Sequence, residues 1–259
     1  PMAADLSPFP WLAYGIDAWQ RSVIFLDVLR ERGNAFLAAE GDPMRNVLTF
    51  GFEVVKDGRD LPRPVNYWMA RVTPPEGAPP TDPLNRPFIV IDPRAGHGPG
   101  IGGFKADSEI GVALAAGHPC YFVGFRPEPI PGQTIEDVVR AIVAFAEEAG
   151  RRHPEAEGKP VAIGNCQAGW ALLMAAAIRP EAFGPLLVAG SPISYWAGVP
   201  GKAPMRYLGG LLGGSWLTAM TGDLGGGIFD GAWLVSNFES GNPANTYWTK
   251  QFEVWADVD

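Results

Sequence analysis

The stretch Val161-Ala162-Ile163-Gly164-Asn165-Cys166-Gln167-Ala168-Gly169 decides the fold. Its first three residues are typical of a buried parallel strand, and the residues from Ala168 to Ile178 are typical of a helix that ends before Pro180. Cys166 therefore stands where a strand turns directly into a helix. A nucleophilic residue in that position predicts a nucleophile elbow, a turn so tight that the residues two before and two after it must be small.

Gly164 and Ala168 meet this demand for small residues, and we expect both of them and Gly169 to support the elbow. The following helix would point its N-terminus at the sulfur of Cys166 and favour the thiolate over the thiol. The alternative is a core cysteine that happens to follow a strand, since free cysteine is often buried. The coincidence of glycine, strand and helix favours the elbow.

The composition describes a globular protein. The chain has 259 residues, of which 47% are hydrophobic and 19% charged, enough to build a substantial core. A net charge of -8 argues against nucleic acid as a partner, because the phosphates would repel it. Two cysteines, Cys120 and Cys166, do not make a disulfide framework, so we expect a reducing, cytoplasmic compartment. No secretory signal or membrane span is recognisable.

Three zones follow one another along the chain. Residues 1–45 contain an aromatic-rich amphipathic segment, which predicts a helix from Pro10 to about Arg32, with an interruption at Gly33-Asn34 before a short continuation to Ala39. Residues 46–192 carry the α/β signal. Residues 193–259 are an irregular zone rich in glycine and tryptophan. We interpret this third zone as a lid or insertion over an acyl pocket, with irregular packing loops as the alternative.

In the central zone, apolar runs alternate with helical patterns. Strands are expected at 47–55, 65–72, 87–91, 120–125, 161–163 and 185–189, and helices at 106–116, 134–149 and 168–178. This alternation predicts an α/β fold with a mostly parallel sheet and helices on both faces, opened by an antiparallel hairpin.

A glycine-rich loop at 94–103 follows the predicted strand at 87–91. Gly98, Gly100 and Gly103 formally match a dinucleotide fingerprint, but they begin too far after the strand, so we expect no such cofactor. Acyl-transfer enzymes of the elbow type place an oxyanion donor in this loop. We expect one donor to be the backbone amide of Gln167 and the other to come from Ala95 or Gly96.

Two sets of residues carry a resemblance to known families. The Gly-Asn-Cys-Gln-Ala-Gly sequence at 164–169 is similar to the Gly-x-Cys-x-Gly-Gly box of polyhydroxyalkanoate synthases, with Ala168 as a departure, and the segment 117–125 resembles the strand before their elbow. Residues 17–22 with 92–98 look like a little-characterised bacterial family of synthase-like proteins. The resemblance implies an α/β-hydrolase fold and a cysteine acyltransferase acting on an acyl-CoA or ester substrate. It also implies an Asp and then a His after the nucleophile.

The histidines conflict with this implication, because His97, His118 and His153 all precede Cys166. His97 lies in the oxyanion loop and is the one candidate base. The favoured explanation is that the chain is a fragment that lacks the C-terminal strands carrying the base. The alternative is a degenerate hydrolase whose pocket binds without turnover.

The expected partners follow from these readings. Two alternatives to acyl transfer remain. One is hydrolysis by a thioesterase or esterase on the same site, and the other is non-catalytic binding of acyl groups or polymer. No metal site or cofactor is expected, because both cysteines stand alone. The chain would form a homo-oligomer or pack against the missing C-terminal part of the same protein.

Overall fold

The computed structural model describes residues 9–96, 98–194, 199, 216–231, 235, 236 and 240–258. Contacts divide the chain into two units, Pro1–Asp42 with Trp233–Asp259, and Pro43–Ala232. Much of the predicted lid at 193–259, and His97, lie outside the described residues.

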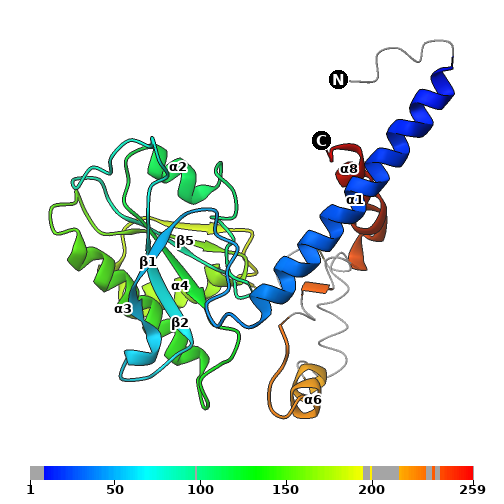
Figure 1. Cartoon of the computed structure of the whole chain (residues 1–259). Coiled ribbons are helices and arrows are strands. Elements are labelled where there is room, and N and C mark those ends of the chain that lie inside the picture. The colour runs from blue at the N-terminus through cyan, green and yellow to red at the C-terminus, as the bar shows by residue number, and fades with distance from the viewer. Residues whose placement is uncertain are drawn as a thin grey trace. The chain divides into compact units, whose positions relative to one another are not determined.

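The smaller unit is helical. It contains α1 (Pro10–Glu40), the π-helical segment η3 (Ala244–Thr249) and α8 (Lys250–Ala256). The indole N–H of Trp255 donates to Oγ of Ser22 at 3.0 Å, and Nη1 of Arg21 donates to the carbonyl of Ala256 at 2.6 Å. These bonds join two segments that are more than 200 residues apart in sequence. Figure 1 shows α8 lying beside α1.

The α1 helix runs through Gly33 and Asn34 without a break, so the predicted interruption is wrong. A single glycine within a helix costs only about 1 kcal/mol relative to alanine, which the helical residues on either side can offset.

The larger unit is built on a six-stranded sheet with the strand order β1-β2-β4-β3-β5-β6. The strands are β1 (Phe52–Asp57), β2 (Tyr67–Val72), β3 (Phe88–Ile91), β4 (Cys120–Phe125), β5 (Val161–Asn165) and β6 (Leu186–Ala189). The β1/β2 and β2/β4 pairs are antiparallel, and the β4/β3, β3/β5 and β5/β6 pairs are parallel. The predicted mostly parallel sheet with an opening hairpin is confirmed.

Helices cover both faces of this sheet. On one face α2 (Glu109–Ala115) packs with Val90 and Phe122, and on the other α3 (Ile135–Arg152) and α4 (Gln167–Ile178) pack with Ile89 and Tyr121. Neighbouring strand residues thus alternate between two apolar clusters, as buried parallel strands require. The other elements among the described residues of this unit are η1 (Gly58–Asp60), η2 (Pro180–Ala182) and α6 (Trp216–Leu224).

Local sequence signals explain where the helices begin. The α3 helix starts at a capping box, in which Thr134 Oγ1 accepts from the amide of Asp137 while the Asp137 carboxylate accepts from the amide of Thr134. At α2 only one of these two bonds is present, in which Ser108 Oγ accepts from the amide of Gly111 at 3.5 Å. Each cap satisfies an amide that the first helical turn leaves without a partner.

The segment before β1 differs from its prediction, because residues 47–51 are not strand. The amides of Val47 and Thr49 instead donate to the carbonyls of Pro99 and Gly103, both at 2.9 Å. A Cβ on Gly103 would lie 2.6 Å from Cδ2 of Leu48, so this glycine lets the two segments approach closely. The glycine-rich stretch therefore has a packing role around residues 47–49.

Candidate active site

Cys166 occupies the turn between β5 and α4. Its backbone has φ 49° and ψ -119°, and Arg94 is the other non-glycine residue with positive φ among the described residues. Its amide donates to the carbonyl of Ala189 at 2.8 Å, and its carbonyl accepts from the amide of Gly169 at 3.1 Å. A strained conformation of this kind persists only where the surroundings impose it. The backbone at residue 166 therefore has the predicted elbow geometry.

The neighbours of Cys166 leave no room for larger side chains. A Cβ added to Gly164 would lie 2.7 Å from Cα and 2.9 Å from N of Gly169. A Cβ on Gly169 would lie 2.6 Å from Cβ of Ser191 and 2.8 Å from Cγ1 of Val188. Real Cβ atoms essentially never come within 3.0 Å of another heavy atom. A side chain at Gly164 would therefore displace backbone, and one at Gly169 would displace Ser191 and Val188.

The two thiols lie in different surroundings. Cys166 is half-buried at the N-terminus of the 12-residue helix α4, whose dipole favours a negative charge. Cys120 is buried in the core, and burial raises the pKa of its thiol to about 12. Cys120 is therefore an unreactive thiol within the same chain.

Asp92 organises the loop after β3. Its carboxylate accepts from the amides of Arg94 (2.9 Å), Gly100 (2.8 Å) and Ile101 (3.1 Å), which folds the chain back on itself. Burial raises the pKa of Asp92, and these three backbone donors oppose that rise. The sequence did not single out Asp92, although a carboxylate directly after a buried strand was a signal that could have done so.

Three amides predicted to serve as oxyanion donors have no acceptor among the described residues. Gln167 is the first residue of α4, and its amide donates to no described residue. The amides of Ala95 and Gly96 likewise have no acceptor in the described part of the chain, and Gly96 has φ 73°. Free amides can bind an anionic oxygen when they lie at the start of a helix, or in a loop whose residues alternate between right- and left-handed backbone conformations. The oxyanion roles of these residues stay predictions.

A mainly apolar cavity of about 280 Å³ adjoins the elbow. Gln167 and Ala168 line it from the start of α4, and Pro93 and Arg94 from the loop after β3. Its apolar walls come from Tyr67, Ile91, Ile135, Val138, Val139, Ile142, Trp170 and Ala171. The guanidinium of Arg94 lies 5.4 Å from the centre of the Tyr67 ring, at cation–π distance. Such a cavity suits an apolar chain with a polar group at one end.

A polar contact behind the elbow was missed by sequence reasoning. Nδ2 of the buried Asn165 donates to Oε2 of Glu109 at 2.8 Å. This bond ties the residue before Cys166 to the first turn of α2, on the face of the sheet opposite α4. No local pattern could have predicted it, because the partners are 56 residues apart.

Two histidines lie away from Cys166. Nδ1 of His118 is 2.9 Å from the carbonyl oxygen of Arg86, just before β4 begins. Nε2 of His153 is 2.8 Å from the hydroxyl of Tyr121, at the C-terminal end of α3. Both residues lie at the N-terminal edge of the parallel strands. His97, the predicted candidate base, is outside the described residues.

No group of three or more metal-ligating side chains is found in the described part of the chain. Across the same residues, every helix is too short or too polar to cross a membrane.

The hairpin-first sheet, its strand order and the elbow after β5 define an α/β-hydrolase-like fold. Residues 17–259 match the family described as "Protein of unknown function (DUF3141)", and the chain belongs to this family.

One curated relative is the "Uncharacterized protein in ackA 5'region" of Rhizobium meliloti, 64% identical over 263 residues. The match covers all of this chain and 36% of that protein, so the chain spans about a third of the relative's length.

Solved structures give weaker likenesses. Esterase B from Lactobacillus rhamnosis is 12% identical with a TM-score of 0.40, over 74% of this chain and 64% of that one. A structure from work on carboxylesterases of the thaumarchaeon Nitrososphaera gargenis is 18% identical with a TM-score of 0.36, over 54% and 45% of the two chains.

Proposed function

We propose that this chain carries out acyl transfer through Cys166, in the manner of polyhydroxyalkanoate synthases, with an acyl-CoA thioester as donor. The observation that carries the proposal is the strained backbone of Cys166, φ 49° and ψ -119°, between a parallel strand and a helix start. A fold maintains such strain where it holds a reactive side chain in place.

The first chemical step exchanges one thioester for another. The thiolate of Cys166 attacks the carbonyl carbon of the acyl-CoA and forms a tetrahedral intermediate. The bond from that carbon to the sulfur of CoA then breaks, and the departing thiolate takes up the proton that Cys166 gave up. The acyl group can pass in a second step to a hydroxyl acceptor.

Three further observations support this step. The free amides of Gln167, Ala95 and Gly96 are the donors that we propose for the negative oxygen of the intermediate. The apolar cavity of about 280 Å³ beside them would hold the acyl chain. The α4 N-terminus would stabilise the thiolate before attack.

Transfer to the acceptor needs a general base. Within this chain the candidate is His97, and in the resembled family the base is a histidine downstream of the nucleophile. The chain spans 36% of its curated relative, so the activity of the whole protein is part of the proposal.

Two other functions use the same site. A thioesterase or esterase would deliver the acyl group from Cys166 to water. A non-catalytic module would bind acyl chains or polymer in the cavity without forming a covalent bond.

Trapping of the acyl-enzyme tests the proposal. The chain is incubated with a short acyl-CoA, released CoA is measured with a thiol reagent, and the protein is mapped by mass spectrometry. We expect one acyl group on Cys166, none on Cys120, and none in a Cys166→Ala variant. Release of free acid would favour hydrolysis. Slower hydrogen exchange at the cavity residues in the presence of the acyl-CoA, without a covalent adduct, would favour the binding module. If neither cysteine is acylated and the acyl-CoA does not slow hydrogen exchange at the cavity, the whole proposal is contradicted.

A further inference from the structure

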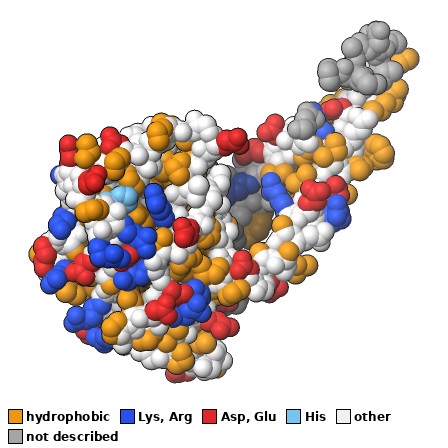
Figure 2. All heavy atoms as spheres, turned by 60° about the vertical axis from the view of Figure 1, so that its left-hand side comes forward, with side chains coloured by type: hydrophobic (Ala, Val, Ile, Leu, Met, Phe, Trp, Pro, Cys, Tyr) orange, Lys and Arg blue, Asp and Glu red, His pale blue; other side chains and the backbone are white. Residues whose placement is uncertain are grey.

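A second pocket lies at the edge of the sheet opposite the elbow. It has a volume of about 370 Å³ and is lined by Arg71, Thr81, Pro83, Pro119, Tyr121, Arg152 and His153. Every polar side chain in this lining can donate a hydrogen bond, and none is a carboxylate. Figure 2 shows basic side chains gathered around a histidine on one face of the core.

The strand register separates this pocket from Cys166. Val123 and Gly164 both pair with Ile91, so they lie at the same level of the sheet. Tyr121 is two residues below that level and Cys166 two above, which gives about 13 Å along the strands. Two strand spacings add about 10 Å sideways. The second pocket is therefore a separate site.

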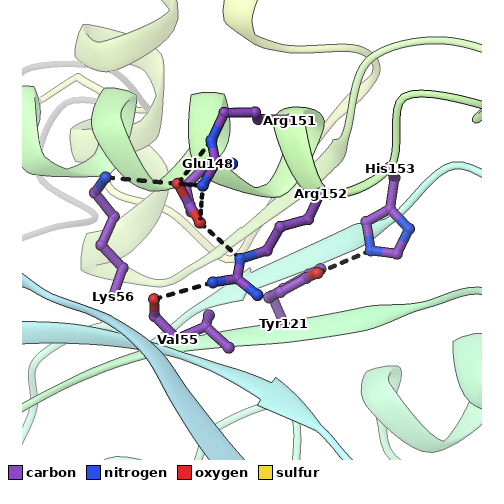
Figure 3. Close-up of polar contacts among 7 residues, drawn as sticks. All are labelled: Val55, Lys56, Tyr121, Glu148, Arg151, Arg152 and His153. Carbon is purple, nitrogen blue, oxygen red and sulfur yellow. Dashed lines mark hydrogen bonds and ion pairs between the residues drawn. The ribbon is translucent and has the colours of Figure 1, made fainter.

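The side chains of the pocket are held by the core. Tyr121 is buried, with 1% of its surface exposed, and its hydroxyl bonds to Nε2 of His153 at 2.8 Å (Figure 3). Arg71 stands directly opposite Tyr121 in the β2/β4 register, so both point to the same face. The pocket thus has a rigid wall, with the basic groups on its rim.

The arginines leave an excess of positive charge. The Glu148 carboxylate, which pairs with the pocket residue Arg152, is shared among Arg151, Arg152 and Lys56 at 2.6, 2.6 and 3.7 Å (Figure 3). The side chain of Arg71 has no ion pair or hydrogen bond in the described part of the chain. Glu53 faces Arg71 across the β1/β2 pair, yet no ion pair joins them.

The positive charges of the pocket also affect the pKa of His153. Burial lowers the pKa of His153, and the charges of Arg71 and Arg152 lower it further. An anion placed between the two guanidinium groups would remove this repulsion and gain charge-assisted hydrogen bonds from both.

We propose that the pocket bounded by Arg71, Thr81, Tyr121, Arg152 and His153 binds a phosphate group. Two guanidinium groups and two hydroxyls offer the oxygen-directed donors that phosphate requires. The competing explanation is that the arginines of α3 compensate the negative end of the helix dipole. That explanation does not account for Arg71, because it comes from β2 and has no partner.

Phosphate titration of the whole chain tests this site. Calorimetry measures the affinity for inorganic phosphate at constant ionic strength, with chloride as the reference anion. Arg71→Gln removes the unpaired guanidinium at an exposed position, so the fold should be retained, which circular dichroism checks. We expect this change to weaken binding at least about tenfold. Arg140→Gln removes the same charge from an exposed site elsewhere on α3 and should leave binding unchanged.

Two further binding experiments distinguish which kind of molecule supplies the phosphate group. Tighter binding of a soluble phosphate monoester than of inorganic phosphate, with the same loss in Arg71→Gln, would assign a phosphorylated metabolite. Retention on phosphatidic acid vesicles, but not on phosphatidylcholine vesicles, would assign a lipid headgroup. Phosphate binding that is absent, or equal in wild type and Arg71→Gln, overturns the proposal.

Discussion

Replacement of Gly164 by alanine tests the steric basis of the elbow. The added methyl would lie 2.7 to 3.0 Å from Cα and N of Gly169 and the carbonyl carbon of Ala168. All three are backbone atoms of the turn and the first turn of α4, so no side-chain rotation can relieve the overlap. The turn must open.

The magnitude follows from this geometry. Overpacking in a core costs typically 1–3 kcal/mol, and contact with backbone puts Gly164→Ala at the upper end, about 3 kcal/mol. For a unit of this size, 1 kcal/mol moves the unfolding midpoint by about 2–4 °C. The expected shift is therefore about 6–12 °C downward.

Thermal unfolding monitored by circular dichroism measures this shift, and hydrogen exchange follows the amide of Cys166, which donates to Ala189. Gly51→Ala is the matched control, because its added methyl would lie 3.6 Å from Cβ of Thr73, an ordinary contact. Its stability should change by no more than about 1 kcal/mol. Wild-type stability and unchanged exchange in Gly164→Ala would refute the steric account.

Two other predictions concern carboxylates. Asp92→Asn should lower the free energy of unfolding by about 2 kcal/mol and speed exchange at the Gly100 amide, because an amide cannot accept all three backbone bonds. Asp82→Asn, at an exposed residue with one such bond, should have a smaller effect, and equal effects would contradict this role. Arg151, with Arg152 and Lys56, lowers the pKa of Glu148 against the effect of burial. The ionised Glu148 therefore stabilises the fold above the ordinary Glu pKa, and this stabilisation is lost as pH falls through the lowered pKa of Glu148. Glu148→Gln should thus flatten the loss of stability as pH falls below the ordinary Glu pKa, which denaturant unfolding at a series of pH values measures.

Local patterns in the sequence predicted the framework of the site. The apolar run before Cys166 and the small residues around it determine strand, turn and helix together, because each is a short-range requirement. The predicted strand at 120–125 has the same bounds as β4. The α/β fold class followed from the alternation of such segments.

Contacts between distant segments could not be predicted in this way. The bond between Asn165 and Glu109, and the facing of Arg71 and Tyr121, depend on which strands become neighbours. Residues 47–49 read as strand because they are apolar, but they pack instead along the loop at 99–103. The spacing of apolar residues indicates that a segment is buried, but it does not indicate which other segment it packs against.

The rate of iodoacetamide labelling of the native chain, resolved by peptide mapping, tests the activated thiol most directly. The account predicts that Cys166 reacts faster than a free peptide cysteine and that Cys120 stays unlabelled until the protein unfolds. Labelling of Cys166 no faster than that of the peptide would contradict the activated nucleophile on which the proposed function rests.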